Sequence, residues 1–168
     1  MFALDETLQH LPKTELYDEL HRQGRGLLDG ERDPIANAAN LAALLYWTLP
    51  GLNWAGFYFL RQPNELVLGP FHGKPACVRI PVGRGVCGTA VAEGKTQIVA
   101  DVHAFPGHIA CDAASRSELV IPLLWKGCSF GVLDLDSPLP DRFDPTDAAG
   151  CGQLVELFLH GSDFTKLY

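Results

Sequence analysis

The chain changes its hydrophobic periodicity twice along its length, and this change limits its possible folds more than any other feature. Apolar residues recur at helical spacing over about 13–49, at strand spacing over about 53–137, and at helical spacing again over about 145–160. The short connections "RQPN" and "KGCS" favour antiparallel hairpins. This order predicts an α+β fold: a mostly antiparallel sheet of about six strands, flanked by N-terminal helices and a C-terminal helix.

Local signals place the individual elements. Helices are expected over 13–29 and 34–48, and Asp33 and Pro34 suit the cap and the first position of the second helix. A short helix is expected over 85–94, and Asp144 should cap a final helix that begins at Pro145. The expected strands are 54–60, 65–71, 77–82, 96–101, 119–124 and 130–136.

Composition indicates a single domain and excludes some classes of partner. The 168 residues are 47% hydrophobic, and they contain no repeat or charged linker, so we expect one domain over 1–168. A net charge of −7 without a basic run disfavours nucleic acids and anionic membranes as partners. The start "MFALDETLQH" is too acidic for a secretory signal, and no apolar run approaches the roughly 20 residues of a membrane span. A cytoplasmic location is therefore expected, with the five cysteines as thiols at rest.

The segment "HAFPGHIACDAASRSELVIPL" surrounds Cys111 with polar groups. Cys111 may be read as a metal ligand, a disulfide partner, a nucleophile or a small buried residue. We expect "IACDAAS" to form a short helix whose first turn favours a thiolate, although the adjacent Asp112 opposes it. A metal site would use His103, His108 and Cys111, with Cys77 as a further candidate. The spacing H-x4-H-x2-C lacks the paired motifs typical of zinc, so no metal is expected.

The strand "FGVLDLDSP" carries two acids. Asp134 and Asp136 must share one face of it, while Leu133 and Leu135 share the other. Either the acids reach solvent at a strand end, or they face a ligand with an ammonium group while one carboxyl keeps its proton. Glu118 begins the neighbouring predicted strand and is positioned to join them.

Trp54 and Tyr58 occupy one side of the first predicted strand, either as aromatic core or as the wall of a pocket. Cys128 and Cys151 match no motif and are assigned to structure. Gly150 and Gly152 weaken the last helix, which close packing against the sheet or a partner subunit would explain.

Four stretches together resemble one family: "NWAGFYFL", "GPFHGKPACVRIPVGRGVCGTA", "DVHAFPGHIACDAASRSELVIPL" and "FGVLDLDSP". They are similar, from about Asn53 to Leu157, to the free methionine-(R)-sulfoxide reductases, which are stand-alone GAF-domain enzymes. The resemblance implies a GAF-like fold and reduction of free L-methionine-(R)-S-oxide to L-methionine. It further implies a homodimer with no bound cofactor, recycled by thioredoxin as external reductant.

The resemblance also assigns roles to residues. It implies that Cys111 is the nucleophile, Cys77 the main resolving thiol and Cys87 a secondary one. By the same resemblance, the acids Glu118, Asp134 and Asp136 hold and polarise the substrate, and Trp54 and Tyr58 line its pocket. For the substrate carboxylate, the candidates are backbone N–H groups of "GRGVCG" or of the Cys111 helix, with Arg84 or Arg116. The competing interpretation is a small-molecule-sensing GAF module without catalysis, although the sequence lacks a fused output domain or long signalling helix.

Overall fold

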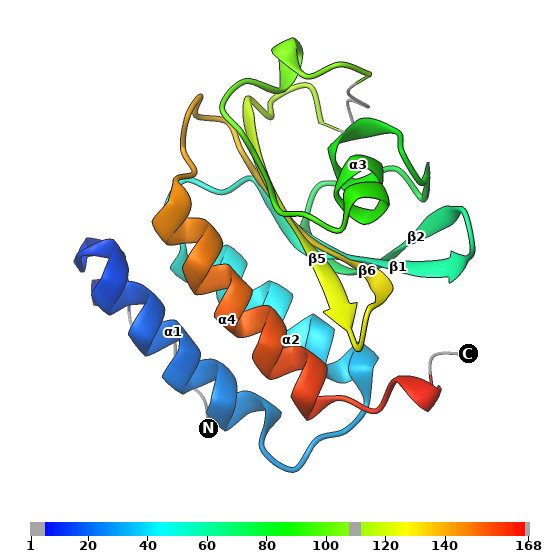
Figure 1. Cartoon of the computed structure of the whole chain (residues 1–168). Coiled ribbons are helices and arrows are strands. Elements are labelled where there is room, and N and C mark those ends of the chain that lie inside the picture. Colours follow the sequence, from blue (N-terminus) through cyan, green and yellow to red (C-terminus); the bar gives the residue numbers. More distant parts are fainter. Residues whose placement is uncertain (1–5, 108–111, 167–168) are drawn as a thin grey trace.

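An antiparallel six-stranded sheet lies at the centre of the computed structural model, which describes residues 6–107 and 112–166 (Figure 1). The strand order is β3-β2-β1-β6-β5-β4, and every pairing is antiparallel. The strands are β1 (Trp54–Gln62), β2 (Glu65–Gly73), β3 (Arg79–Pro81), β4 (Gln97–Val99), β5 (Ser117–Trp125) and β6 (Cys128–Ser137). The helices are α1 (Lys13–Leu28), α2 (Pro34–Thr48), α3 (Gly85–Glu93) and α4 (Pro145–Gly161). The predicted α+β fold, with an antiparallel sheet of six strands flanked by helices, is confirmed.

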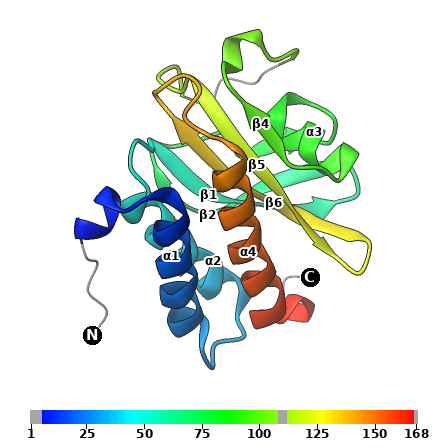
Figure 2. The same ribbon diagram turned by 60° about the vertical axis from the view of Figure 1, so that its left-hand side comes forward.

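The sheet separates two apolar layers. Helices α2 and α4 cover one face, with α1 packed against them, whereas α3 lies on the other face (Figures 1 and 2). Because side chains alternate along a strand, Phe57 and Leu133 enter the core beneath the three long helices. Tyr58 and Val132 enter the second cluster, together with residues of α3. The second layer is smaller, and this is where the polar residues of the sheet gather.

Both predicted helix caps are confirmed. Asp33 accepts hydrogen bonds from the backbone N–H groups of Ile35 and Ala36, and Pro34 occupies the start of α2. Asp144 and Asp147 form a reciprocal capping box at the start of α4. Within the described ranges, no helix is long and apolar enough to cross a bilayer.

Helices α1 and α4 meet at a buried polar contact. The carboxylate of Asp147 accepts a hydrogen bond from Tyr17 at 2.9 Å, lies 2.6 Å from the Lys13 ammonium and is 3.1 Å from Arg142. This close approach explains Gly150, because a Cβ there would lie 2.2 Å from the Tyr17 ring. The contact is therefore with α1, not with the sheet as the sequence had led us to consider.

The remaining features of the last helix and the hairpin agree with structural roles. Gly152 has nothing within 4 Å of an added Cβ, so packing does not explain it. Cys151 is buried in α4, and Cys128 is exposed in the β5–β6 hairpin.

Gly150→Ala and Gly152→Ala should change stability in opposite directions. The added methyl of Gly150→Ala must displace the Tyr17 ring, so overpacking should cost about 1–3 kcal/mol of unfolding free energy. Gly152→Ala meets open space and should gain up to about 1 kcal/mol from helix propensity. Urea denaturation of both variants measures the difference, and equal shifts would contradict this account of the α1–α4 contact.

Candidate active site

Two adjacent strands, β5 and β6, bring three carboxyl groups onto one face of the sheet. Asp136 on β6 pairs with Trp54 on β1 and with Glu118 on β5. Asp134 lies two residues earlier on the same face, while Leu133 and Leu135 belong to the core on the opposite face. The alternation predicted for this strand is confirmed, and Glu118 does join the two aspartates.

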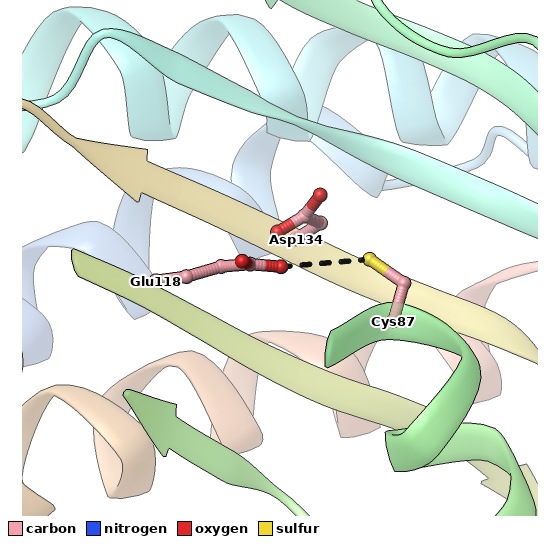
Figure 3. Close-up of side chains that lie close together, drawn as sticks. All are labelled: Cys87, Glu118 and Asp134. Atoms are coloured by element: carbon pink, nitrogen blue, oxygen red, sulfur yellow. Dashed lines mark hydrogen bonds between the residues drawn. The ribbon is translucent and has the colours of Figure 1, made fainter. Parts of the chain in front are cut away.

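The acids are buried, which answers the question of solvent exposure. Glu118 and Asp134 expose only 6% and 5% of their surface. Asp136 is half-buried at the edge of the group. Cys87, in the first turn of α3, completes the cluster, because its thiol donates to Glu118 Oε1 at 3.9 Å (Figure 3). The exposed strand end considered from the sequence is therefore wrong for Asp134.

Burial raises the pKa of all three acids, and repulsion by neighbouring carboxylates adds to the rise for Glu118 and Asp136. Burial, followed by the charges of the neighbouring aspartates, raises the pKa of Glu118 well above its usual range. Burial and the charge of Asp134 raise the pKa of Asp136 in the same way. Burial raises the pKa of Asp134 to about 7, with hydrogen bonds from Cys87 and Glu118 limiting the rise. Asp134 should therefore ionise first, while Glu118 and Asp136 retain protons at neutral pH.

The acids form the floor of a hollow with about 530 Å³ of empty space, its open mouth included. Trp54 forms one wall, stacked on Phe71 at 5.3 Å and on Tyr58 at 5.8 Å between ring centroids. The Trp54 ring lies over Gly56, where a Cβ would stand 2.6 Å from it. The residues that line the hollow are Trp54, Tyr58, Lys74, Pro75, Ala76, Ile80, Gly85, Val86, Cys87, Asp112, Ser115, Glu118, Asp134 and Asp136.

Polar residues from three loops meet at the hollow. Asn53 donates to Ser115 Oγ at 3.1 Å and to Asp112 at 3.3 Å, and Lys74 lies 3.3 Å from Asp112. Asp112 also accepts from the backbone N–H of Ala114, which makes Asp112–Ser115 a turn. The expected helix "IACDAAS" is therefore wrong over its described part, because the Asp112 side chain binds the backbone that a helix would use.

The structure places the other predicted site residues as follows. Cys111 and His108 lie outside the described residues. Cys77 follows β2 and is disulfide-bonded, and its carbonyl accepts from Tyr58 Oη at 3.0 Å. Arg84 and Arg116, considered for the substrate carboxylate, are not among the residues that line the hollow.

The histidine-based metal site gains no support from the described residues. His103 is 61% exposed and bonds Asp101 at 3.0 Å. Another trio does offer ligand atoms within 4.8 Å of one another, namely Cys87, Glu118 and Asp134. Metal ligands must lose their protons, whereas burial raises the pKa of all three groups. That chemistry favours protons at this position, and the absence of a metal stays a prediction.

Sequence reasoning missed the residues at the mouth. Lys74 stands in the stretch "HGKPAC" and belongs to no motif of its own, and Asp112 was predicted only to affect Cys111. Ser115 and Asn53 carry no distinctive motif. Their contacts arise from loops 59 and 62 residues apart in sequence, so local patterns could not reveal them.

Comparison with known proteins agrees with this geometry. The GAF domain family matches residues 27–158. The free methionine-R-sulfoxide reductase of Escherichia coli is 54% identical over 93% of this chain and 96% of its own length. The crystal structure of the Neisseria meningitidis free methionine-R-sulfoxide reductase in complex with its substrate superposes with a TM-score of 0.86. It is 44% identical and covers 96% of this chain and 93% of that one. A protein of Burkholderia vietnamiensis described as a GAF sensor is 56% identical, with a TM-score of 0.87 over 90% of this chain and 96% of its own.

The buried acids predict an unusual dependence of stability on pH. A carboxyl whose folded pKa exceeds its unfolded pKa binds extra protons in the folded state, so stability falls as pH rises between the two values. For Asp134 that window runs from 3.8 to about 7. Reduced wild-type protein should lose on the order of a few kcal/mol of unfolding free energy from pH 5 to pH 8.

Asp134→Asn should lose clearly less over the same range, as measured by urea denaturation at each pH. The exposed carboxyl of Asp101 has a lowered pKa, because of its hydrogen bonds with His103, and it stays ionised throughout this range. Asp101→Asn therefore serves as the control and should keep the wild-type slope. Identical slopes for wild type and Asp134→Asn would contradict the assignment.

Proposed function

Because the chain belongs to the GAF-domain family, and within it to the free methionine-R-sulfoxide reductases, we propose that it reduces free L-methionine-(R)-S-oxide to L-methionine. The enzyme is an oxidoreductase that acts on sulfur. Its proposed nucleophile is Cys111, and its proposed reductant is thioredoxin.

The observation that carries this proposal is the group of three buried carboxyls on the floor of the hollow. Neutral carboxylic acids donate hydrogen bonds, and a sulfoxide oxygen accepts them. Asp134 Oδ1 is buried without a hydrogen-bond partner among the described residues, which is costly unless a ligand supplies a donor. A zwitterionic sulfoxide meets both needs, since it carries an acceptor oxygen and an ammonium donor.

The proposed chemistry transfers one oxygen atom. The Cys111 thiolate attacks the sulfoxide sulfur while a protonated Glu118 or Asp136 donates to its oxygen. The protonated oxygen then transfers from the substrate sulfur to the Cys111 sulfur as the new sulfur–sulfur bond breaks. Methionine leaves as the reduced thioether, and Cys111 becomes a sulfenic acid. An ionised carboxylate, Asp112 or Asp134, balances the ammonium group. The stacked ring of Trp54 supplies an apolar wall for the substrate's methyl and methylene groups.

A second thiol then condenses with the sulfenic acid, giving a disulfide and water. Cys77 is the proposed resolving residue, because it lies in the loop after β2 beside the lining residue Ala76 and already forms a disulfide. Cys87 is the proposed secondary one. Burial and the nearby acids raise the pKa of the Cys87 thiol well above its usual range, which makes it a slow nucleophile. Thioredoxin would reduce the disulfide in the cytoplasm, and the active form would be a homodimer.

The alternative is a GAF module that binds a small molecule without turnover, and the similarity to the Burkholderia vietnamiensis protein favours it. A pure sensor has no need for a buried thiol, that of Cys87, among three carboxyls. The two proposals differ in one measurable property, which is consumption of reductant.

A coupled assay tests the enzyme. With thioredoxin, thioredoxin reductase and free methionine-(R)-sulfoxide, the protein should oxidise NADPH. Cys111→Ser should lose at least about 10³-fold in rate, because no other group replaces the nucleophile. Cys77→Ser should allow about one turnover and leave a sulfenic acid that dimedone traps.

The matched control is Cys128→Ser, since Cys128 is exposed in the β5–β6 hairpin and should be dispensable. Binding without NADPH oxidation by reduced wild-type protein would support the sensor instead. Full activity in Cys111→Ser would refute the proposed nucleophile.

A further inference from the structure

Lys74 is the single cation among the described residues that line the hollow. It lies directly after β2, two residues before Ala76, which also lines the hollow. Its backbone carbonyl accepts a hydrogen bond from Trp54 Nε1 at 3.2 Å. The main chain of Lys74 is therefore fixed to the aromatic wall, so the base of its side chain has a defined position at the pocket.

The ammonium group of Lys74 stands at the open side. It lies 3.3 Å from Asp112 Oδ2 and 3.5 Å from Oδ1, and its side chain is 70% exposed, compared with 16% for Asp112. An ammonium has three N–H donors, so a single carboxylate leaves donors for a second acceptor. Asp112 remains ionised, because the Ala114 N–H, Lys74 and Asn53 all lower its pKa.

The floor and the mouth of the hollow thus differ in charge. The floor carries the acids Glu118, Asp134 and Asp136, so it favours neutral or cationic groups of a ligand. A carboxylate of the ligand would be repelled there by an ionised acid. Free methionine sulfoxide has its sulfoxide at one end and its carboxylate at the other. With the sulfoxide oxygen and the ammonium group both on the acids, the negatively charged carboxylate is directed away from the floor. It then lies toward the mouth, where Lys74 is the one cation among the described lining residues.

We propose that Lys74 binds the α-carboxylate of free methionine sulfoxide. Asp112 orients the ammonium group of Lys74 before the substrate binds. This inference rests on the proposed function and adds a determinant of specificity to it. A methionine sulfoxide within a polypeptide has an amide in place of the carboxylate, so it cannot form this ion pair. Lys74 thereby favours the free amino acid.

Two substrates separate the role of Lys74 from general damage: methionine-(R)-sulfoxide and its carboxamide, which keeps the sulfoxide and ammonium but lacks the carboxylate. Wild-type enzyme should prefer the acid in kcat/KM by about tenfold, the effect of one charge-assisted hydrogen bond. Lys74→Met should remove that preference by slowing reaction with the acid alone. Lys74→Arg, which keeps the charge, should retain most of it.

Lys95→Met is the matched control, since Lys95 is exposed and is not among the residues that line the hollow. It should keep the wild-type preference. Two results would overturn the inference: an unchanged preference in Lys74→Met, which would move the carboxylate toward the N–H groups at the start of α3, or an equal loss on both substrates. Failure of wild-type protein to reduce either substrate would instead refute the proposed function.

Discussion

The rest of the site depends on the burial of three carboxyl groups on one face of a sheet. Neither Asp134 nor Asp136 can turn away, because their spacing on β6 fixes both toward the same side. The antiparallel register with β5 places Glu118 directly opposite Asp136. Three charges so close together in a dry site would cost far more than the fold can supply. Glu118 and Asp136 therefore hold protons at neutral pH, while Asp134 ionises near that pH. Those protons are what the proposed sulfoxide reduction needs.

The surrounding structure keeps these acids in position. At the ends of their strands, Ser117 Oγ donates to the carbonyl of Leu139 at 2.7 Å, and Ser137 Oγ donates to that of Gly51 at 2.6 Å. Arg142 donates its backbone N–H to Ser117 and its guanidinium to Asp147, which joins the strand ends to the α1–α4 contact. The three-helix layer thus supports the site from the opposite face of the sheet.

Much of the fold could be predicted from the sequence, because each element carried its own local signal. The caps at Asp33 and Asp144 and the alternation of Asp134 with Leu135 were all predictable from neighbouring residues. The site was less predictable, because its contacts join distant loops. Cys87 reaches Glu118 only through the placement of α3, and Lys74 reaches Asp112 only through the folding of two loops. The expected helix after residue 108 failed in its described part, since Asp112 bonds its own local backbone.

The central claim is that the pocket holds protonated carboxyls that can donate to the sulfoxide oxygen. Their protonation state can be measured directly. Carbon-13 NMR of the side-chain carboxyls of reduced, substrate-free protein would follow Glu118, Asp134 and Asp136 through a pH titration, with Asn variants assigning each signal. We expect Asp134 to titrate near pH 7 and the other two to remain protonated at that pH. Titration of all three below about pH 5, as in ordinary exposed carboxyls, would contradict the account.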